Sequence, residues 1–397
     1  MLPLAGTLLL ARLAGAMLGL TLILFVLQRY HSPVLAGLMA LAWMPGLLLS
    51  PLGGVLIDRF GRTRLIALDM GVVLAKVIAI VLLSLTGLLS PASLILVVGL
   101  GSVTSALTSV GTRSLIPLVV PSRLWERGNA LDATTFNATM IAGPALGGLL
   151  FATVGGLATL TVIGGVCLAA ALLVSRIRDA DLAARPHRNV LSETLGGLRY
   201  AFGNPALRGL ALIMPLSSLG FGILQVALPV LFRTFPYGGS AVAGGLWSVF
   251  GLAATVGAIV AGRMATEGRE RRILFVTLLL GAAGYCVVAA APLASVPLLL
   301  AAVGMAVTGG FVGPQDIAMF SLRQRSIEAA WLGRALSVSM SISALGLPLG
   351  AALGGLVIQV SLFGSMALGA GLAFVTALLT PLLLPPGRTA AQPQPSG

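Results

Sequence analysis

The sequence predicts an all-α integral membrane protein with twelve transmembrane helices arranged in two bundles of six. Three observations lead to this fold class. Of the 397 residues, 57% are hydrophobic and only 9% are charged, whereas about a quarter of a soluble domain is charged. The hydrophobic residues form continuous runs of about 20, the length of one membrane-spanning helix. An internal repeat divides the runs, since Ala145–Leu149 and Ala352–Leu356 both read ALGGL.

Twelve apolar runs are long enough to cross a bilayer, and they do not alternate in polarity as the strands of a β-barrel would. The 51 glycines and 22 prolines fit membrane helices that pack closely and bend. We expect the spans at roughly 4–28, 34–56, 65–88, 93–116, 130–153, 157–175, 207–232, 241–264, 273–291, 295–319, 335–359 and 364–384.

The two halves follow one plan at an offset of about 205 residues, as in transporters whose halves rock around a central site. Gly128–Leu131, for example, returns as Gly333–Leu336. We expect an N-terminal bundle at 1–178, a cytoplasmic linker at 179–204, a C-terminal bundle at 205–384 and a disordered cytoplasmic tail at 385–397. Within the linker, four apolar residues share one helical face, which predicts an amphipathic helix in the membrane interface. These residues are Leu191, Leu195, Leu198 and Phe202.

The net charge of +13 would suggest nucleic acid in a soluble protein. Here the arginines gather in alternate loops, which is typical of cytoplasmic loops in membrane proteins, so no nucleic-acid partner is expected. Arg323, Arg325 and Arg334 are counted among them, and they flank the loop after the tenth span. The other side has only Arg29 and Arg233. Both termini are therefore predicted in the cytoplasm, in a bacterial-type inner membrane.

Residues that could hold a metal or cofactor do not form a pattern in this sequence. Cys167 and Cys286 lie inside predicted spans and are interpreted as packing residues. Metal-binding histidine–glutamate spacing, a serine–base arrangement and a nucleotide loop are not found. We therefore expect no cofactor, no metal and no enzymatic activity. A membrane-embedded enzyme is kept as a remote alternative.

A dense polar turn follows the second span, where residues 54–64 read GVLIDRFGRTR. The pattern G-x-x-x-D-R-x-G-R resembles the loop between helices 2 and 3 of the major facilitator superfamily. The resemblance implies a latch on the cytoplasmic side, in which Asp58 faces the start of helix 11 near Gly333. In the alternative interpretation, the arginines only anchor the loop in the cytoplasm. The residues of this cytoplasmic gate motif are Gly54, Asp58, Arg59, Gly61, Arg62 and Arg64.

The fifth span carries Gly143, Pro144, Gly147 and Gly148, where a proline is expected to bend the helix. The segment resembles the G-P-x-x-G-G element of exporters in this superfamily. The linker resembles that of the enterobactin-exporter-like and macrolide-efflux-like branch. The resemblance implies a monomer in the lipid bilayer that exports a hydrophobic or amphiphilic drug, natural product or siderophore in exchange for protons. The alternatives are that Pro144 is an ordinary kink, and that the chain is an uptake symporter or uniporter for a small organic solute.

Ionisable residues inside spans are functional candidates because they are costly in a bilayer. Each acid either exchanges protons or pairs with a nearby base. The first span has no acid, although many members of the efflux branch place one there. The candidate proton or charge sites are Asp69, Lys76, Arg12, Arg113, Asp132 and Asp316.

The first, fourth, seventh and tenth spans are expected to line the substrate path, by analogy with the family. Their walls are mostly apolar with scattered hydroxyls, which suits a bulky amphiphile better than a sugar. The candidate cavity residues are Thr21, Thr108, Ser217 and Gln225. In the eleventh span, the pairs Ser337/Ser341 and Ser339/Ser343 are interpreted as helix-packing residues.

Overall fold

The computed structural model describes residues 2–49, 60–105, 107, 125–176, 190–233, 239–263, 266–293, 295–328 and 331–385. Every regular element in these ranges is helical. Nine helices among them are long and apolar enough to cross a membrane. Three shorter apolar stretches accompany them, Pro33–Leu48, Pro91–Leu100 and Ala138–Val154. The all-α membrane fold is thereby confirmed, and the count of twelve spans stays a prediction.

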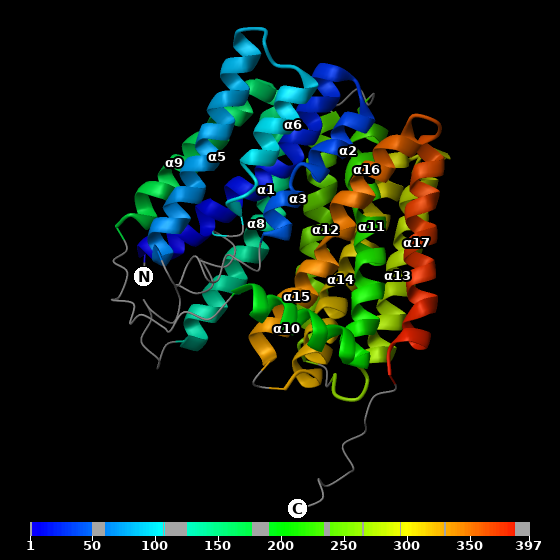
Figure 1. Cartoon of the computed structure of the whole chain (residues 1–397). Coiled ribbons are helices and arrows are strands. Elements are labelled where there is room, and N and C mark those ends of the chain that lie inside the picture. The colour runs from blue at the N-terminus through cyan, green and yellow to red at the C-terminus, as the bar shows by residue number, and fades with distance from the viewer. Residues whose placement is uncertain are drawn as a thin grey trace, which may run out of the picture.

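The first half of the chain forms one group of helices, in which α1 packs on α8 and α9, and α5 packs on α9 (Figure 1). The expected second span is divided into two helices at Ala42 and Trp43. The members of this N-terminal group are α1 (Leu2–Tyr30), α2 (Pro33–Leu41), α3 (Met44–Leu48), α5 (Arg62–Leu85), α6 (Pro91–Leu100), α8 (Trp125–Val154) and α9 (Gly156–Val174).

The second half forms a similar group, in which α13 packs on α14 and α17, and α11 packs on α16 and α17. The members of this C-terminal group are α11 (Pro205–Phe232), α12 (Gly239–Ala261), α13 (Glu270–Ala290), the short 3-10 helix η2 (Ala291–Leu293), α14 (Pro297–Ser326), α15 (Leu332–Ala344), α16 (Gly346–Ile358) and α17 (Leu362–Leu383). We call the face at which α1 begins and α17 ends the termini face (Figure 1).

Among the described helices, α2, α6, α11 and α17 begin with a capping side chain, and on the opposite face the caps of α2 and α6 are followed by proline. The hydroxyl of Ser32 accepts a hydrogen bond from the Leu35 amide (3.2 Å) before Pro33. Ser90 and Ser93 form a capping box around Pro91. A side-chain oxygen at this position satisfies one of the free amides of the first turn, and proline lacks the amide that would be unpaired there.

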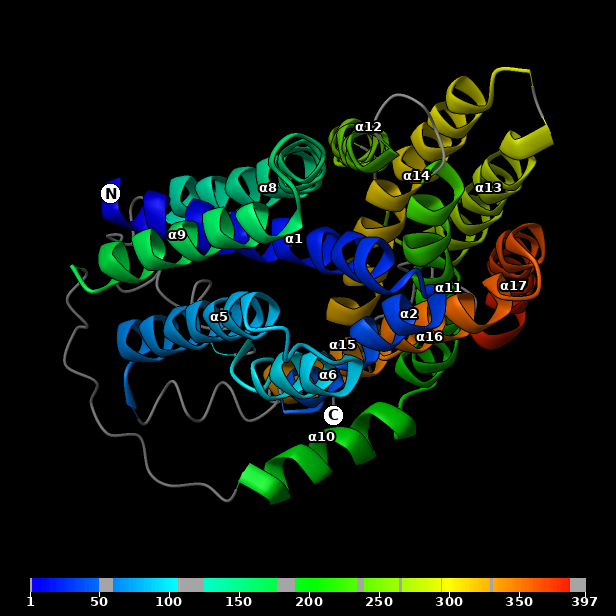
Figure 2. The same cartoon turned by 90° about the horizontal axis from the view of Figure 1, so that it is seen from above.

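The linker carries α10 (Val190–Gly203), which lies across the termini face rather than along the long helices (Figures 1 and 2). One side of α10 packs on α15, where Tyr200 stacks on Trp331 at 5.3 Å between ring centroids. Leu195, Leu198 and Phe202 are exposed on it. The linker therefore contains a helix with an apolar exposed face, as the spacing of these residues predicts.

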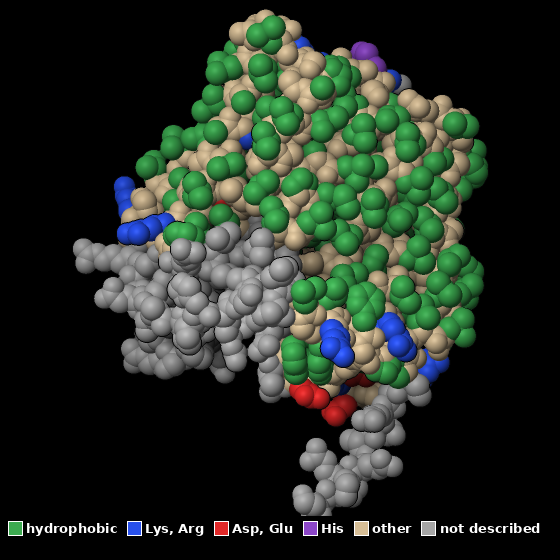
Figure 3. All heavy atoms as spheres, in the orientation of Figure 1, with side chains coloured by type: hydrophobic (Ala, Val, Ile, Leu, Met, Phe, Trp, Pro, Cys, Tyr) green, Lys and Arg blue, Asp and Glu red, His purple; other side chains and the backbone are tan. Residues whose placement is uncertain are grey.

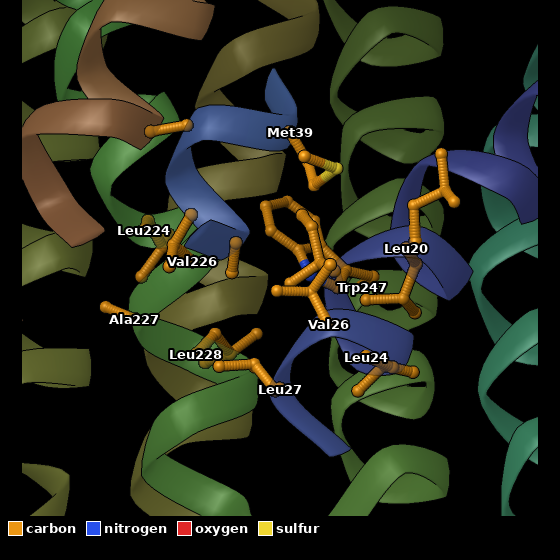
Figure 4. Packing of buried hydrophobic residues seen from close by; sticks show 14 of the residues in the cluster. Leu20, Leu24, Val26, Leu27, Met39, Leu224, Val226, Ala227, Leu228 and Trp247 are labelled. Carbon is orange, nitrogen blue, oxygen red and sulfur yellow. The ribbon is translucent and has the colours of Figure 1, made fainter. Parts of the chain in front are cut away.

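The two groups meet through α2 against α16 and through α8 against α12 (Figure 2). A continuous hydrophobic core crosses between them in the half of the molecule away from the termini face. Figure 4 shows this core: Leu27 of α1 lies beside Leu228 of α11, and Trp247 of α12 lies beside Val26 of α1. The groups are thus joined by apolar packing towards the opposite face.

Glycines bring the backbones of the two groups into contact at this junction. A Cβ on Gly37 of α2 would lie 2.3 Å from the Ala351 carbonyl oxygen of α16. A Cβ on Gly244 of α12 would lie 2.4 Å from the Pro144 carbonyl oxygen of α8. The Ser248 hydroxyl also donates to the carbonyl of Ile141 at 2.7 Å. Because a side chain at either glycine would separate the helices, this close approach requires glycine.

The lateral surface is apolar, and the charges gather near its ends. Figure 3 shows hydrophobic side chains over most of the visible face, with Lys and Arg near its margins. Exposed leucines such as Leu85, Leu172 and Leu382 would contact lipid. Among the described residues, the exposed arginines of the termini face are Arg64, Arg176, Arg199, Arg208, Arg263, Arg269, Arg272 and Arg325, and those of the opposite face are Arg29 and Arg233.

Candidate functional site

A cavity of about 720 Å³ lies between the two groups, enclosed by α1, α8, α11, α12 and α14. Gly15, Gly19 and Gln225 also line a second space of about 330 Å³ under α2, α3 and α16. Because they share these walls, we treat the two spaces as one central cavity. Its size is that of a typical small-molecule site.

The wall of the central cavity is apolar and aromatic. Phe221 of α11 lies 5.2 Å from Trp247 and 5.4 Å from Phe250, both on α12, between ring centroids. Phe136 and Phe320 add further aromatic surface. The polar side chains that reach the wall are Ser105, Gln225, Thr255 and Asp316. A large apolar wall with few polar groups suits a bulky ligand that has a limited number of polar atoms.

The central cavity extends towards the termini face. Phe136, Ala258 and Phe320 line it, and all three lie in the halves of α8, α12 and α14 nearer that face. Towards the opposite face, the glycine contacts and the hydrophobic core close the space between the groups. The structure therefore represents a conformation that is closed on the opposite face.

Lys76, the only lysine of the chain, is buried in α5 with 3% of its surface exposed. Its Nζ lies 4.6 Å from the centre of the Trp43 ring, a cation–π contact. Trp43 in turn lines the central cavity. Asp69, two turns earlier on α5, accepts a hydrogen bond from Thr104 at 2.6 Å. The lysine and its acid thus lie behind the cavity wall rather than in it.

Arg12 of α1, like Lys76, contacts an aromatic ring that lines the central cavity. Its guanidinium donates to the Thr135 hydroxyl of α8 at 2.9 Å and lies 5.7 Å from the centre of the Phe136 ring. Of the other charged candidates, Asp132 falls in α8 with its side chain outside the described residues, as does the whole of Arg113. Asp316 of α14 opens onto the central cavity.

Arg323 was expected in a loop, but it lies inside α14 with 1% of its surface exposed. Its Nε donates to the Ser339 hydroxyl at 3.1 Å, and its Nη2 donates to the hydroxyl of Ser343. These two serines, interpreted from the sequence as packing residues, bind a buried cation and connect α15 to α14. The signal was available, because serines four residues apart share one helix face.

The four predicted cavity residues are placed differently from one another. Gln225 lines the central cavity, and Ser217 lines a neighbouring space of about 230 Å³ within the C-terminal group. Thr21 corrects the expectation: it is fully buried, and its hydroxyl faces Gly147 of α8. The reason is that α1 turns this side to α8 rather than to the cavity. Thr108 lies outside the described residues.

The gate motif is described only in part. Gly54, Asp58 and Arg59 lie outside the described residues. Gly61 has a φ of 91° and precedes α5, a conformation that glycine adopts without strain. Arg62 belongs to α5 with its side chain undescribed, and Arg64 is exposed.

The glycines of the fifth-span motif lie at helix contacts on two sides of α8. A Cβ on Gly143 would lie 2.4 Å from the Ala16 side chain of α1, and one on Gly147 would lie 3.2 Å from the Met17 carbonyl. A Cβ on Gly148 would meet the Ser240 carbonyl at the start of α12 at 2.4 Å. Helix α8 continues through Pro144. The motif thus allows α8 to pack closely against both groups.

Comparisons with known proteins agree with this arrangement. The sequence model of the Major Facilitator Superfamily matches residues 4–347. A protein of Sinorhizobium fredii, described as the uncharacterized MFS-type transporter y4rN, is 38% identical over 387 residues, which cover 96% of this chain and 93% of that protein. The multidrug efflux pump Tap of Mycolicibacterium fortuitum is 30% identical over 400 residues, with 96% and 93% covered.

The enterobactin exporter EntS of Shigella boydii is 26% identical over 347 residues, which cover 84% of this chain and 79% of that protein. Among solved structures, the nucleoside transporter NupG superimposes with a TM-score of 0.75 at 13% identity, covering 96% of this chain and 99% of that one. A D-xylose–proton symporter does so with a TM-score of 0.71 at 13% identity, with 96% and 98% covered. At such identities, these two structures establish the fold alone. The chain belongs to the Major Facilitator Superfamily, whose members are membrane transporters.

Proposed function

We propose that this protein exports a hydrophobic or amphiphilic small molecule, such as a drug, a natural product or a siderophore, in exchange for protons by alternating access. The observation that carries the proposal is the central cavity, whose larger space of about 720 Å³ has an aromatic and apolar wall. Such a wall binds a bulky apolar body, while Gln225 and Asp316 offer a few polar contacts. Tap is an efflux pump and EntS is an exporter, which supports export over uptake.

The proposed topology has twelve spans in two six-helix bundles divided by the linker at 179–204, and the protein acts as a monomer. The termini face is assigned to the cytoplasm of a bacterial-type inner membrane. The arginine distribution supports this orientation, because cytoplasmic loops carry an excess of arginine and lysine. In the conformation closed on the opposite face, a substrate would then enter from the cytoplasm, as an exporter requires.

In the proposed cycle, the protein is closed first on one face and then on the other. The glycine contacts of α2 with α16 and of α8 with α12 close the outer side. The gate motif with Asp58 closes the cytoplasmic side when those contacts open. A proton is taken up on Asp69, Asp132 or Asp316 in one state and released in the other. This exchange couples proton flow to substrate transport.

Transport by inverted membrane vesicles that contain the protein tests the direction and the driving force. We expect the fluorescent amphiphile Hoechst 33342 to accumulate inside when the lumen is acidified, and to leave when the proton gradient is collapsed. Vesicles without the protein are the control. Protein-dependent loss of preloaded dye from the acidic lumen would instead establish transport in the direction of uptake, and movement that ignores the gradient would reject proton coupling.

A further inference from the structure

A smaller cavity of about 230 Å³ opens off the central cavity inside the C-terminal group, among α11, α12, α13, α14 and α17. We call it the α13–α14 pocket. Its wall contains five polar side chains besides Thr308, whose hydroxyl donates to the carbonyl of Gly304 at 2.9 Å. The five are Ser217, Ser218, Tyr285, Gln315 and Asp316.

These five side chains make no hydrogen bond or salt bridge with the part of the chain that the structure describes. Their polar atoms reach the pocket, because the only buried side-chain oxygens and nitrogens without a partner among the described residues are those of Thr7 and Thr21. Tyr285 is 9% exposed, and Asp316 is exposed. Polar groups that face a cavity inside a membrane-spanning group bind what enters that cavity, because the surrounding lipid offers no partner. The pocket is therefore suited to a polar occupant.

The chemistry of the wall selects a small cation. The polar atoms are hydroxyl, amide and carboxylate groups, and the oxygens of such groups are the ligands that small hard cations prefer. Among the described residues, no lysine, arginine or histidine lines the pocket. Its volume of about 230 Å³ has room for about seven water molecules, at about 30 Å³ each, so a bulky amphiphile does not fit.

We propose that the α13–α14 pocket is the binding site of the coupling cation, which is either a proton held by Asp316 beside ordered water or a sodium ion. The inference deepens the proposed function and rests on it. In the proton form, the Asp316 carboxylate takes a proton from hydronium and leaves water. On release, the carboxylic acid returns that proton to water.

Asp316 also connects the pocket to the substrate. The α13–α14 pocket and the central cavity share Phe221, Phe250, Val312 and Asp316, of which Asp316 alone is polar. A substrate in the central cavity and a cation in the pocket therefore meet at this one carboxylate. Competition at a shared carboxylate makes the binding of one ligand favour the release of the other, which an exchange mechanism requires.

Arg323 connects the pocket to α15. It lies seven residues after Asp316 on α14, about 10 Å along the axis, and its guanidinium binds Ser339 and Ser343 of α15. Charge on Asp316 attracts this guanidinium, and a bound cation cancels the attraction. Tyr285 on α13 and Arg323 are the titratable groups near Asp316 among the described residues. The linings contributed by α11, α12 and α17 are uncharged. Arg323 is thus a positioning residue for α15.

Two binding measurements on the purified full-length protein, with no substrate added, test the site. The first is binding of radioactive sodium at about pH 8, and the second is the infrared band of a protonated carboxyl between about pH 5 and about pH 9. We expect one of the two signals in the wild type and its loss in Asp316→Asn. Tyr285→Phe should weaken the signal about fivefold, since one hydrogen bond is lost. Asp316→Glu should retain it, and Gln225→Ala, in the central cavity alone, should leave it unchanged.

The two arms distinguish sodium from the proton, and thermal unfolding of each variant checks that it is folded. If the wild type gives neither signal, or if folded Asp316→Asn keeps the signal of the wild type, the site proposal is overturned. The vesicle assay separates this failure from failure of the proposed function. Gradient-driven export that survives Asp316→Asn would leave the function standing and place the cation elsewhere. Cation binding without transport would leave the pocket standing and reject the function.

Discussion

Gly244 offers a direct perturbation of the contact that closes the opposite face. A Cβ there would lie 2.4 Å from the Pro144 carbonyl oxygen and 3.1 Å from Cα of Gly148, so Gly244→Ala forces α12 away from α8. Forcing a methyl group into a packed interface costs about 1–3 kcal/mol. The gain in helix propensity from alanine, at most about 1 kcal/mol, is equal in every conformation with an intact α12. The whole packing cost therefore disfavours the conformation described here.

A cost of that size shifts a conformational equilibrium by about 5- to 150-fold. We expect the population open on the opposite face to rise accordingly. The neighbouring Gly245 is the matched control, because a Cβ on it meets nothing within 4 Å. Gly245→Ala gains the same propensity without the clash and should behave as the wild type.

The assay is the distance between spin labels on the opposite face, one on each group of helices. Leu88 and Val360 are exposed there, so Leu88→Cys and Val360→Cys can be labelled after Cys167→Ser and Cys286→Ser. Double electron–electron resonance should show that a population with a longer distance between the labels increases in Gly244→Ala only. Identical distance distributions in Gly244→Ala and Gly245→Ala would refute the assignment of α8 and α12 to the contact that closes the opposite face.

Three further predictions follow from the buried charges and the gate motif. Trp43→Leu removes the ring 4.6 Å from Lys76, a contact of about 1–2 kcal/mol. It should lower the melting temperature by more than Trp43→Phe does. Equal melting temperatures of the two variants would contradict the cation–π contact. Arg323→Ala removes the donor that binds two serine hydroxyls of α15 and should destabilise the protein more than Ser343→Ala, whose expected cost is about 1–2 kcal/mol. Thermal unfolding decides, and the reverse order would argue against this role. Asp58→Asn should abolish transport in vesicles at normal expression, with the exposed Glu267→Gln as the charge-matched control; full activity would discard the latch.

The membrane class and the helical fold were readable from the sequence, because bilayer thickness fixes the length of each apolar run. The linker helix was also predictable from the spacing of Leu195, Leu198 and Phe202. The central cavity was predicted less well. Gln225 lines it, whereas Thr21 faces α8, because the sequence does not specify how each helix is rotated about its axis.

The buried charges show the same limit. Arg323 looked like a loop arginine because it lies close to Arg325 at the end of a span. Only the length of α14, which continues to Ser326, places it inside the protein. Trp43 gave no sequence signal of its cavity position, since its contact with Lys76 joins residues 33 positions apart in the chain. Pairings between distant helices are fixed by tertiary packing and not by local pattern.

Access to Gln225 from the two faces tests most directly whether the central cavity opens to each side in turn. Gln225→Cys, in protein with Cys167→Ser and Cys286→Ser, is exposed to a membrane-impermeant maleimide in right-side-out and in inverted vesicles. The account predicts labelling from both sides, with Gly244→Ala increasing the rate from the outer side. Labelling from one side only, under every gradient applied, would contradict alternating access.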